Sequence, residues 1–283
     1  MIFRSEMFKR VTIIGVGLMG GSLGLAIKKH SLARQVVGFS QKETSIAEAL
    51  KNKAIDEGFT DVTKAVRNSD LVVLAAPVQA IIKLMPVINP HLWRHCIVTD
   101  MGGTKVDILE AAEKNLSSAS FFVGSHPLAG SEKQGVQNAR SDLFENTQCL
   151  MTPTAKTNPF AKEKVKQLWT KLGAKVKFIS AEEHDEILNF ISHLPHLMAF
   201  GLMGTVPDKC VEYAAQGLKD TTRIASSSPQ LWSDICLSNP KNIIRALDDF
   251  SKQLSFFRKA ILDRDEKGLT AYFAKAKERR EKF

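Results

Sequence analysis

The sequence predicts an α/β fold in which an N-terminal domain with a parallel sheet is followed by an all-helical C-terminal domain. Residues 11–180 alternate short apolar runs with helix-forming stretches, which is the pattern of parallel strands joined by crossover helices. From residue 181 to the end, only helical periodicity is found. A chain of 283 residues is long for one domain, so we expect two domains, at 1–180 and 181–283.

A glycine turn joins the first strand to the first helix. The β-prone residues Val11 to Ile14 run into glycines spaced as GxGxxG, and helix formers follow from Ser22 to Lys29. In a Rossmann-type domain these glycines allow a tight turn, the approach of a pyrophosphate, and close packing of helix and strand. The alternative is a plain tight turn, but the strand–turn–helix context favours a dinucleotide site. The residues expected to bind the cofactor here are Gly15, Gly17, Leu18, Met19 and Gly20.

The other elements of the first domain follow from apolar runs and the glycines and prolines between them. Helices are expected at 42–52, 78–87, 159–172 and after Lys105. Pro86 and Pro90 are expected to close the helix at 78–87, and Gly173 to cap the helix at 159–172. The expected strands are 35–39, 71–76, 96–99, 121–123, 148–151 and 175–179.

The helical domain contains one long apolar helix near its end. Leu254, Phe256, Phe257 and Ile261 give this helix an apolar face, which is buried either against a second copy of the chain or within its own domain. Both alternatives stay open, and the first predicts a homodimer through the helical domain. The helices expected after residue 180 are 181–191, 195–203, 210–221, 230–236, 240–262 and 267–282.

The end of the second strand bears on the choice of cofactor. An acidic residue about 20 positions past the glycine turn usually binds the ribose hydroxyls and selects NAD. Here Ser40, Gln41 and Lys42 occupy that region, and the first carboxylate is Glu43. A hydroxyl, an amide and a cation suit a 2′-phosphate, so we favour NADP over NAD. Ser40 also fits a helix N-cap with Glu43 completing a capping box, and both interpretations can hold together.

Three strand ends carry polar or turn residues, and parallel strands direct such ends at the ligand crevice. The three ends are Ala76-Pro77, Asp100 to Thr104, and Gly124 to Ser131. The third holds His126 on what we expect to be a rigid loop flanked by glycines. A histidine there suits a general base that removes a hydroxyl proton as hydride leaves, with Ser125 as a substrate contact. The alternative is a loop histidine bonded to backbone. The cofactor candidates at the other two ends are Ala76, Pro77, Gly103 and Thr104.

The helical domain adds two candidate substrate contacts. In the segment Ser192-His193-Leu194-Pro195-His196, Pro195 suits the first turn of a helix, so His196 is expected at a helix start that helps bind anions. Paired histidines without a cysteine or carboxylate at ligand spacing are weak as a metal site, and we expect no metal. Arg223 suits a clamp on a carboxylate, and its alternative is a surface ion pair with Asp220.

Composition narrows the class of protein. The chain is 44% hydrophobic and 24% charged, as in ordinary soluble globular proteins. No apolar run reaches the ~18 residues of a membrane span, and the N-terminal segment lacks the apolar core of a secretory signal, so we expect a cytoplasmic protein without a membrane partner. The formal charge of +9 is spread over many helix faces; it could serve a nucleic acid or anionic small substrates, and composition alone leaves both options open. We expect a small-molecule substrate and no nucleic-acid partner. The four scattered cysteines are expected to be buried, reduced thiols.

Five segments together resemble the prephenate/arogenate dehydrogenase family of tyrosine biosynthesis, and the resemblance covers nearly the whole chain. The segments are GVGLMG from Gly15, TDMGGTK from Thr99, GSHPLAG from Gly124, SHLPH from Ser192 and DTTR from Asp220. The resemblance implies a Rossmann domain followed by a helical dimerisation domain, with the active site between them. It also implies an oxidoreductase that oxidises and decarboxylates a cyclohexadienol, with hydride transfer to NAD(P)+.

The resemblance assigns roles residue by residue. His126 would accept the proton of the ring hydroxyl, Ser192 and His196 would line the substrate pocket, His193 would support them, and Arg223 would hold a substrate carboxylate. Histidine at position 196 favours prephenate, with 4-hydroxyphenylpyruvate as the product; arogenate, or acceptance of both substrates, is the alternative. The sequence departs from the family at Gly103, where a serine is common. Either Thr104 supplies that hydroxyl, or water does, or none is needed.

Two other classes stay open on the residues alone. Another two-domain dehydrogenase, for a 3-hydroxyacid or an imine, would need a lysine of the helical domain or a base other than His126. A non-catalytic cofactor sensor or nucleic-acid-binding protein would use the charge of +9 and would bind DNA or RNA in a salt-sensitive way.

Overall fold

A computed structural model describes residues 6–117 and 119–282. The chain divides after Asn239 into two compact units. The first unit holds the sheet and the helices up to α11 (Pro229–Ser238), and the second holds α12 (Pro240–Leu262) and α13 (Glu266–Arg280). The sheet and the residues around it are built within the first unit, so this unit is sufficient to describe the candidate site.

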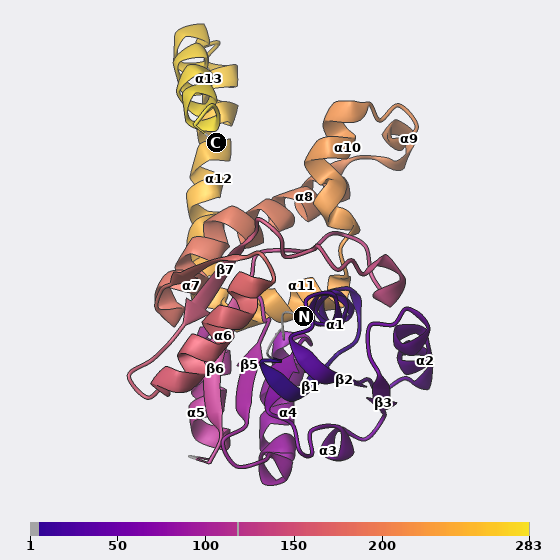
Figure 1. The fold of residues 1–283 in the computed structure, drawn as a ribbon. Coiled ribbons are helices and arrows are strands. Elements are labelled where there is room, and N and C mark those ends of the chain that lie inside the picture. The colour runs from indigo at the N-terminus through magenta and orange to yellow at the C-terminus, as the bar shows by residue number, and fades with distance from the viewer. Residues whose placement is uncertain (1–5, 118, 283) are drawn as a thin grey trace. The chain divides into compact units, whose positions relative to one another are not determined.

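Within the described residues, eight strands form one sheet in the order β3-β2-β1-β4-β5-β6-β7-β8 (Figure 1). The first six strands give the order of a doubly wound dinucleotide-binding sheet, which confirms the predicted α/β class. All neighbouring pairs are parallel except β6 with β7. The strands are β1 (Phe8–Ile14), β2 (Ala33–Phe39), β3 (Glu57–Phe59), β4 (Leu71–Leu74), β5 (Ile97–Asp100), β6 (Phe121–Pro127), β7 (Gln148–Thr152) and β8 (Lys175–Phe178).

Helices cover both faces of the sheet, because each central strand is apolar on both sides. In β1, for example, Ile13 packs into one buried cluster and Ile14 into the other. The first cluster takes residues from α1 (Leu18–Lys29), α2 (Glu43–Lys51) and α6 (Pro159–Lys171). The second takes residues from α3 (Val62–Ala65), α4 (Val78–Ile88) and α5 (Val106–Asn115).

Three features of this sheet domain differ from the expectation. The strand β3 and the helix α3 are absent from the predicted elements, because each has fewer than five residues. Pro86 lies inside α4 instead of closing it. The buried residues Ile81, Met85 and Ile88 hold this helix to the sheet, while Pro86 faces solvent, where water can satisfy the carbonyl that loses its partner.

The segment around His126 is a strand, not the loop that the glycines suggested. β6 runs from Phe121 through Pro127, and its second half pairs antiparallel with β7, His126 opposite Leu150. Gly124 allows this close pairing, since an added Cβ would lie 2.3 Å from the hydroxyl of Thr152. His126 is therefore fixed by sheet hydrogen bonds on a rigid element.

The helical part of the first unit begins with one continuous helical stretch. α7 (Ala181–Leu188) passes through the π-turn η3 (Asn189–His193) into α8 (Leu194–Thr205). Pro195 therefore lies within a helical run, and the expected free helix start at His196 is wrong. The helix predicted at 210–221 is two short helices, α9 (Asp208–Val211) and α10 (Gln216–Thr222), followed by the turn η4 (Arg223–Ser226).

Residues 181–205 are also long and apolar enough to cross a membrane when judged by length and composition alone. Helices of soluble proteins pass the same test. This stretch also carries charged residues at its start, and buried polar residues that belong to the site described below. In the single chain only 22% of its most apolar window is buried, so its apolar residues are available for contacts outside the chain.

The second unit is a pair of helices with aromatic packing between them. The rings of Phe256 and Phe257 contact Tyr272, with centroids 5.2 and 4.8 Å apart. Leu254 and Ile261 remain exposed, Ile261 at 65%. One alternative for this helix was burial of its apolar face within its own domain. These two residues do not fit that alternative, because they remain exposed.

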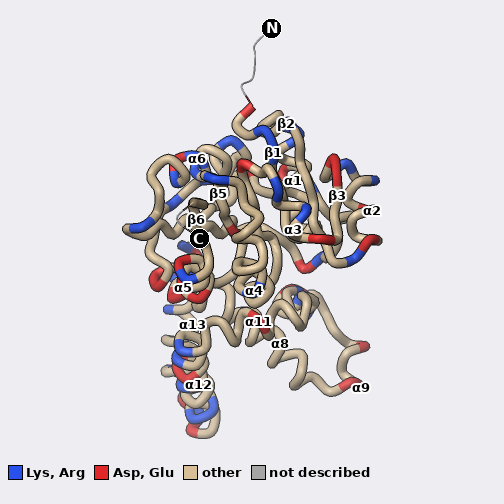
Figure 2. Tube along the Cα trace, turned by 90° about the horizontal axis from the view of Figure 1, so that it is seen from below, with Lys and Arg blue, Asp and Glu red and all other residues tan. Residues whose placement is uncertain are grey.

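The cysteines agree only in part with the expectation. All four are free thiols, but only Cys96 and Cys149 are buried; Cys210 is exposed and Cys236 is half-buried. Lysine and arginine are distributed over many helices and alternate with acidic residues along α12 and α13 (Figure 2).

Candidate active site

The glycine turn brings the start of α1 close to the ends of β1 and β4. Gly15 has φ of +99°, and an added Cβ would lie 2.3 Å from the carbonyl oxygen of Ala75. An added Cβ on Gly20 would lie 1.9 Å from the carbonyl oxygen of Gly15. Among the described residues, no side chain caps the start of α1 at Gly17, so its free N–H groups can bind an anion. These observations fit the pyrophosphate of a dinucleotide.

A cleft of about 750 Å3 runs from this turn past the ends of β4, β5 and β6 to the helical part of the same unit. The cleft brings together residues predicted from both halves of the sequence. Those that line it are Gly17, Met19, Gly20, Ala76, Pro77, Gly103, His126, Ser192, His193, His196 and Arg223. The predicted residues that lie outside this lining are Gly15, Leu18, Ser40, Gln41, Lys42, Thr104 and Ser125.

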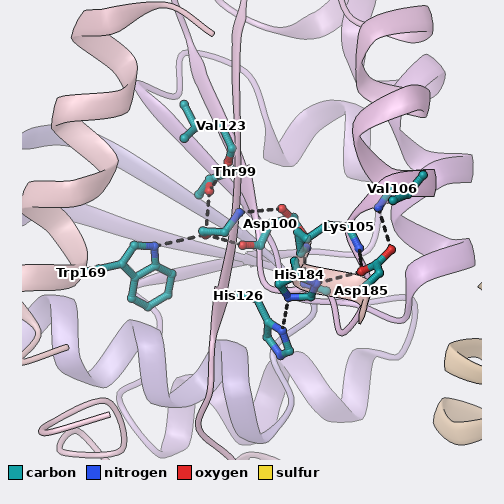
Figure 3. A network of polar contacts seen from close by, with 11 residues as sticks. Thr99, Asp100, Lys105, Val106, Val123, His126, Trp169, His184 and Asp185 are labelled. Carbon is teal, nitrogen blue, oxygen red and sulfur yellow. Dashed lines mark hydrogen bonds and ion pairs between the residues drawn. The ribbon is translucent and has the colours of Figure 1, made fainter. Parts of the chain in front are cut away.

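His126 is the end of a buried chain of polar contacts that we call the histidine relay (Figure 3). Its Nδ1 lies 2.9 Å from Nε2 of His184, and Nδ1 of His184 lies 2.8 Å from Oδ1 of Asp185. Burial, then His184, Lys105 and His193, hold the pKa of His126 well below its ordinary value. His126 is therefore a neutral ring whose Nδ1 is engaged, which leaves Nε2 for chemistry in the cleft.

A second polar cluster lies behind His126 and fixes the ends of β5 and β6. The carboxylate of Asp100 accepts from Lys105 Nζ and from the N–H of Ser125, the latter at 3.1 Å. The Ser125 hydroxyl donates to the Asp100 carbonyl at 2.6 Å and accepts from Trp169 Nε1 at 3.1 Å. Ser125 is fully buried. Its hydroxyl faces the sheet interior, which corrects its expected role as a substrate contact, because side chains of neighbouring strand residues point to opposite faces.

Of the neighbours Gly103 and Thr104, only the first faces the cleft. Gly103 lines the cleft, whereas Thr104 is fully buried and its hydroxyl lacks a hydrogen-bond partner within the described part of the chain. Thr104 therefore does not supply the hydroxyl that the family's serine would bring to position 103. His193 lines the same cleft, which brings an imidazole close to this part of the site.

Two histidines of the helical part flank one tryptophan. The ring of His196 stacks on Trp232 with centroids 3.6 Å apart, and the ring of His193 meets Trp232 edge-on at 6.2 Å. His196 Nδ1 donates to the Ser192 carbonyl at 2.8 Å, so the neutral ring holds its lone pair on Nε2. Burial lowers the pKa of His193 to about 4 and also lowers that of His196. Both rings are therefore uncharged near neutral pH.

Arg223 places a cation on the cleft wall. Its guanidinium donates from Nη1 to Oε2 of Glu132 at 2.7 Å, and its side chain is 60% exposed. The expected alternative partner, Asp220, instead accepts from Gln216 at 2.6 Å. The guanidinium is therefore held at the cleft by an acid from the segment after β6, with donors left over for a ligand.

The residues at the end of β2 form a turn. Ser40 Oγ accepts from the Lys42 N–H at 3.2 Å, and α2 starts with Lys42 at its N-cap position. Ser40 is therefore not the helix N-cap, and the expected capping box does not form. Gln41 and Lys42 are exposed.

Sequence reasoning missed His184, Asp185, Trp232 and Glu132. For the first two the signal was present, because Ala181, His184, Asp185 and Leu188 follow the i, i+3, i+4, i+7 spacing of a buried stripe. Two polar residues on such a stripe need partners inside the protein. Trp232 and Glu132 carry no comparable signal, since their positions beside His196 and Arg223 depend on tertiary contacts.

Comparison with known proteins covers both halves of the chain. Residues 23–178 match the family described as prephenate dehydrogenase, nucleotide-binding domain, and residues 180–275 match prephenate dehydrogenase, dimerization domain. A prephenate dehydrogenase from Bacillus subtilis is 34% identical over 98% of this chain and 76% of its own length. A cyclohexadienyl dehydrogenase from Zymomonas mobilis is 33% identical over 96% of this chain and 95% of its own length.

The fold has a matching solved structure. The prephenate dehydrogenase from Aquifex aeolicus, in complex with hydroxyphenyl propionate and NAD+, superposes with a TM-score of 0.90. It is 33% identical in sequence, and the match covers 99% of each chain.

Proposed function

The chain belongs to the prephenate dehydrogenase family of oxidoreductases, and on this basis we propose that it converts prephenate to 4-hydroxyphenylpyruvate and CO2 with hydride transfer to NAD(P)+. The observation that carries the proposal is the position of His126. Its ring lines one cleft with the glycine turn and with Arg223, and its Nδ1 is engaged by His184.

The proposed mechanism assigns proton transfer to His126. A bound oxidised nicotinamide would accept the hydride that leaves the ring carbon. His126 removes the hydroxyl proton of that carbon through Nε2, which a neutral imidazole with an engaged Nδ1 can do. The ring carboxylate then leaves as CO2, and His126 returns the proton to the oxygen of the phenol. The overall conversion therefore balances without release of a proton.

The substrate contacts follow from charge and hydrogen-bonding capacity. Arg223 holds a carboxylate of the substrate, for which a guanidinium with free donors is suited. Ser192 and His196 line the pocket around the side chain of the substrate, and His193 supports them from the same helical stretch. Ala76, Pro77 and Gly103 lie where a nicotinamide would approach His126.

Arogenate is the second candidate substrate, and His196 favours it in one respect. A neutral His196 presents a lone pair on Nε2, and an acceptor suits the ammonium group that replaces the keto oxygen of prephenate. The same ring becomes a donor when protonated, which suits the keto acid. Acceptance of both substrates is therefore the alternative to a strict preference for prephenate.

The cofactor preference is proposed from the turn after β2. Ser40, Gln41 and Lys42 offer a hydroxyl, an amide and an ammonium, and the first carboxylate after β2 is that of Glu43. These groups suit the 2′-phosphate of NADP. Replacing Lys42 with glutamate should then shift the ratio of kcat/KM values toward NAD.

One steady-state experiment tests the function. Formation of the reduced cofactor is followed by absorbance with prephenate or arogenate and with NAD+ or NADP+. We expect turnover with prephenate and a higher kcat/KM with NADP+. Absence of reduced cofactor in all four combinations contradicts the enzyme class, and a strong preference for NAD+ contradicts the cofactor proposal alone.

We further propose that residues 1–180 bind the cofactor and that residues 181–283 form a substrate and dimerisation domain. Exposed apolar residues of the helical part support a dimer, since a monomer rarely leaves many such residues in water. These exposed residues include Phe190, Ile191, Leu254, Ile261, Leu262 and Phe273.

A further inference from the structure

We propose that His184 and Asp185 are positioning residues that hold His126 in the tautomer with its proton on Nδ1, so that Nε2 is free to take the proton of the substrate. This inference rests on the proposed function for the identity of the substrate. The assignment of the ring protons rests on the contacts of the relay alone.

The argument begins at Asp185 of α7, whose carboxylate lies at the start of α5. Its Oδ1 accepts the N–H of Lys105 at 2.7 Å, and its Oδ2 accepts the N–H of Val106 at 3.0 Å. Both donors are backbone groups that cannot become acceptors, and they favour the carboxylate form. Burial raises the pKa of Asp185 overall, and these two N–H groups and the Lys105 ammonium offset part of that rise. Both carboxylate oxygens nevertheless accept from backbone N–H groups. Asp185 therefore acts as an acceptor toward His184.

The next step fixes the proton of His184. Its Nδ1 lies 2.8 Å from Oδ1 of Asp185, so Nδ1 carries the hydrogen and donates. A neutral imidazole has one hydrogen, and the Nε2 of His184 is then a bare acceptor. Because this Nε2 lies 2.9 Å from Nδ1 of His126, the hydrogen between them belongs to His126. The Nε2 of His126 is left with its lone pair.

The surrounding groups keep both rings neutral, which this argument requires. Burial lowers the pKa of His126 and of His184, and Lys105 and His193 lower both further. Lys105 is itself paired with Asp100 and buried. Cys149, on the strand beside His126, stays a neutral thiol because burial raises its pKa. Burial and the nearby Lys105 and His193 therefore oppose a resting positive charge on either ring.

The relay ends inside the protein. His184 is fully buried and Asp185 is 2% exposed, so the chain of contacts leads to a carboxylate that has little access to water. The proposed reaction releases no net proton, since His126 returns the proton to the phenol oxygen. The relay is therefore suited to orienting His126 and to accepting from it while it is charged, and it is not suited to conducting the proton to solvent.

The first test reads the tautomers directly, in the protein without substrate. Long-range 1H–15N spectra of protein labelled with 15N-histidine distinguish a bare ring nitrogen from a protonated one. We expect His126 to show a bare Nε2 and a protonated Nδ1 near pH 7.5, and His184 likewise. The His126→Asn variant assigns the signals. A protonated Nε2 on His126 would overturn the proposal, whatever the activity.

The second test separates hydrogen bonding from packing. His184→Gln keeps an acceptor near the place of Nε2, whereas His184→Leu fills similar space without one. We expect His184→Leu to lower kcat about 100-fold with KM for prephenate within about threefold, and His184→Gln to recover most of the loss. In the spectra, His184→Leu should give His126 as a mixture of tautomers, and His184→Gln should retain the single form.

Glu182→Gln is the matched control, because it removes one charge from an exposed position of α7, two residues before His184. It should keep the kcat and the spectrum of the unmodified protein. Equal losses in the leucine and glutamine variants would show that His184 only fills space, and unchanged tautomers in the leucine variant would overturn the proposal. If the leucine variant does not fold, the spectrum of the unmodified protein and the glutamine variant still decide. If the unmodified protein fails to oxidise prephenate, the proposed function fails while the tautomer test stands.

Discussion

At the scale of single residues, the site depends on which ring nitrogens of the histidines already have a hydrogen-bond partner within the protein. His126 uses Nδ1 toward His184, and His196 uses Nδ1 toward the carbonyl of Ser192. In both rings the nitrogen that remains is Nε2. These two histidines of the cleft are therefore oriented by other groups of the same chain before any ligand binds, which reduces the entropy lost on binding.

Replacement of His126 tests the base. His126→Asn should lower kcat at least about 100-fold, because proton removal by a positioned base contributes that much or more. The dissociation constant of the nucleotide should stay within about twofold, since His126 acts on the substrate hydroxyl. Steady-state formation of the reduced cofactor, followed by absorbance, gives kcat. Calorimetric titration with the nucleotide gives its dissociation constant. A variant that retains most of its kcat would remove His126 from the chemistry.

Replacement of Arg223 tests binding of the substrate carboxylate. Arg223→Ala should raise KM for prephenate about tenfold with a smaller effect on kcat, because a hydrogen bond to a charged group contributes roughly 1.5–3 kcal/mol, reduced here by solvent. Arg140→Ala is the control, since Arg140 also forms an exposed pair, with Asp142, outside the cleft lining. An unchanged KM in the Arg223 variant would remove Arg223 from the pocket.

The pH profile follows from the direction of the pKa shift of His126. Burial and the nearby Lys105 lower this pKa well below its ordinary value of about 6.5. The neutral ring is the active form, so kcat/KM for prephenate should stay level as the pH falls to 6.5 and should fall only well below it. The measurement is kcat/KM across pH 4.5 to 8 in buffers of constant ionic strength. An acidic midpoint at or above 6.5 would contradict a desolvated base.

Sequence patterns identified the residues that line the cleft more readily than the residues behind them. His126, His196 and Arg223 lie in short segments whose residue types suit proton transfer and anion binding. Ser125 and Thr104 lie in such segments too, yet their side chains point into the interior. The alternation of a strand and the path of the backbone decide that direction, and neither follows from residue type.

At the scale of elements, the glycine turn determines how closely α1 approaches the sheet. Gly15 and Gly17 belong to the same motif but have different surroundings. A Cβ on Gly15 would meet the backbone of Ala75 at a positive φ, whereas a Cβ on Gly17 would meet none of the described atoms within 4 Å. The fold therefore requires the first glycine, whereas no protein contact requires the second, as expected for a glycine that leaves room for a ligand.

This difference gives a matched pair of variants. Gly15→Ala should lower the free energy of unfolding by at least about 2 kcal/mol, because of backbone strain and overlap. Gly17→Ala should change it by less than about 1 kcal/mol but weaken nucleotide binding at least about tenfold, since its methyl group occupies the cleft. Urea denaturation and calorimetric titration measure the two effects. Equal loss of stability in both variants would contradict the assignment.

The order and type of most elements could be predicted, whereas their junctions could not. The apolar runs located the seven described strands other than the short β3, although only the first three residues of β6 were predicted as strand. Its second half contains Gly124, His126 and Pro127, which are poor strand formers, and the pairing with β7 overrides their propensity. Pro195 was read as a helix start, although the π-turn before it allows the helix to continue.

At the scale of the whole molecule, the helices after the sheet expose apolar surface of the kind that marks an interface. α8 carries no charged residue, as Figure 2 shows, and α12 and α13 expose Ile261, Leu262 and Phe273. In the second unit, a hollow of about 310 Å3 is lined largely by apolar residues that include Ile261 and Phe273. Burial of such surfaces between two copies would contribute roughly 25 cal/mol for each Å2 removed from water.

A charge placed in this apolar surface tests the dimer. Ile261→Glu should shift the protein from dimer to monomer at micromolar concentration, because an unpaired carboxylate is costly to bury in an interface. Lys252→Glu is the control: it also introduces a glutamate on α12, but on the side opposite Ile261, where Lys252 pairs with Asp249 in solvent. Light scattering after size exclusion gives the mass of each variant. If Ile261→Glu remains a dimer while Lys252→Glu behaves as the unmodified protein, the interface does not include the end of α12. A monomer in the unmodified protein would contradict the proposed dimer.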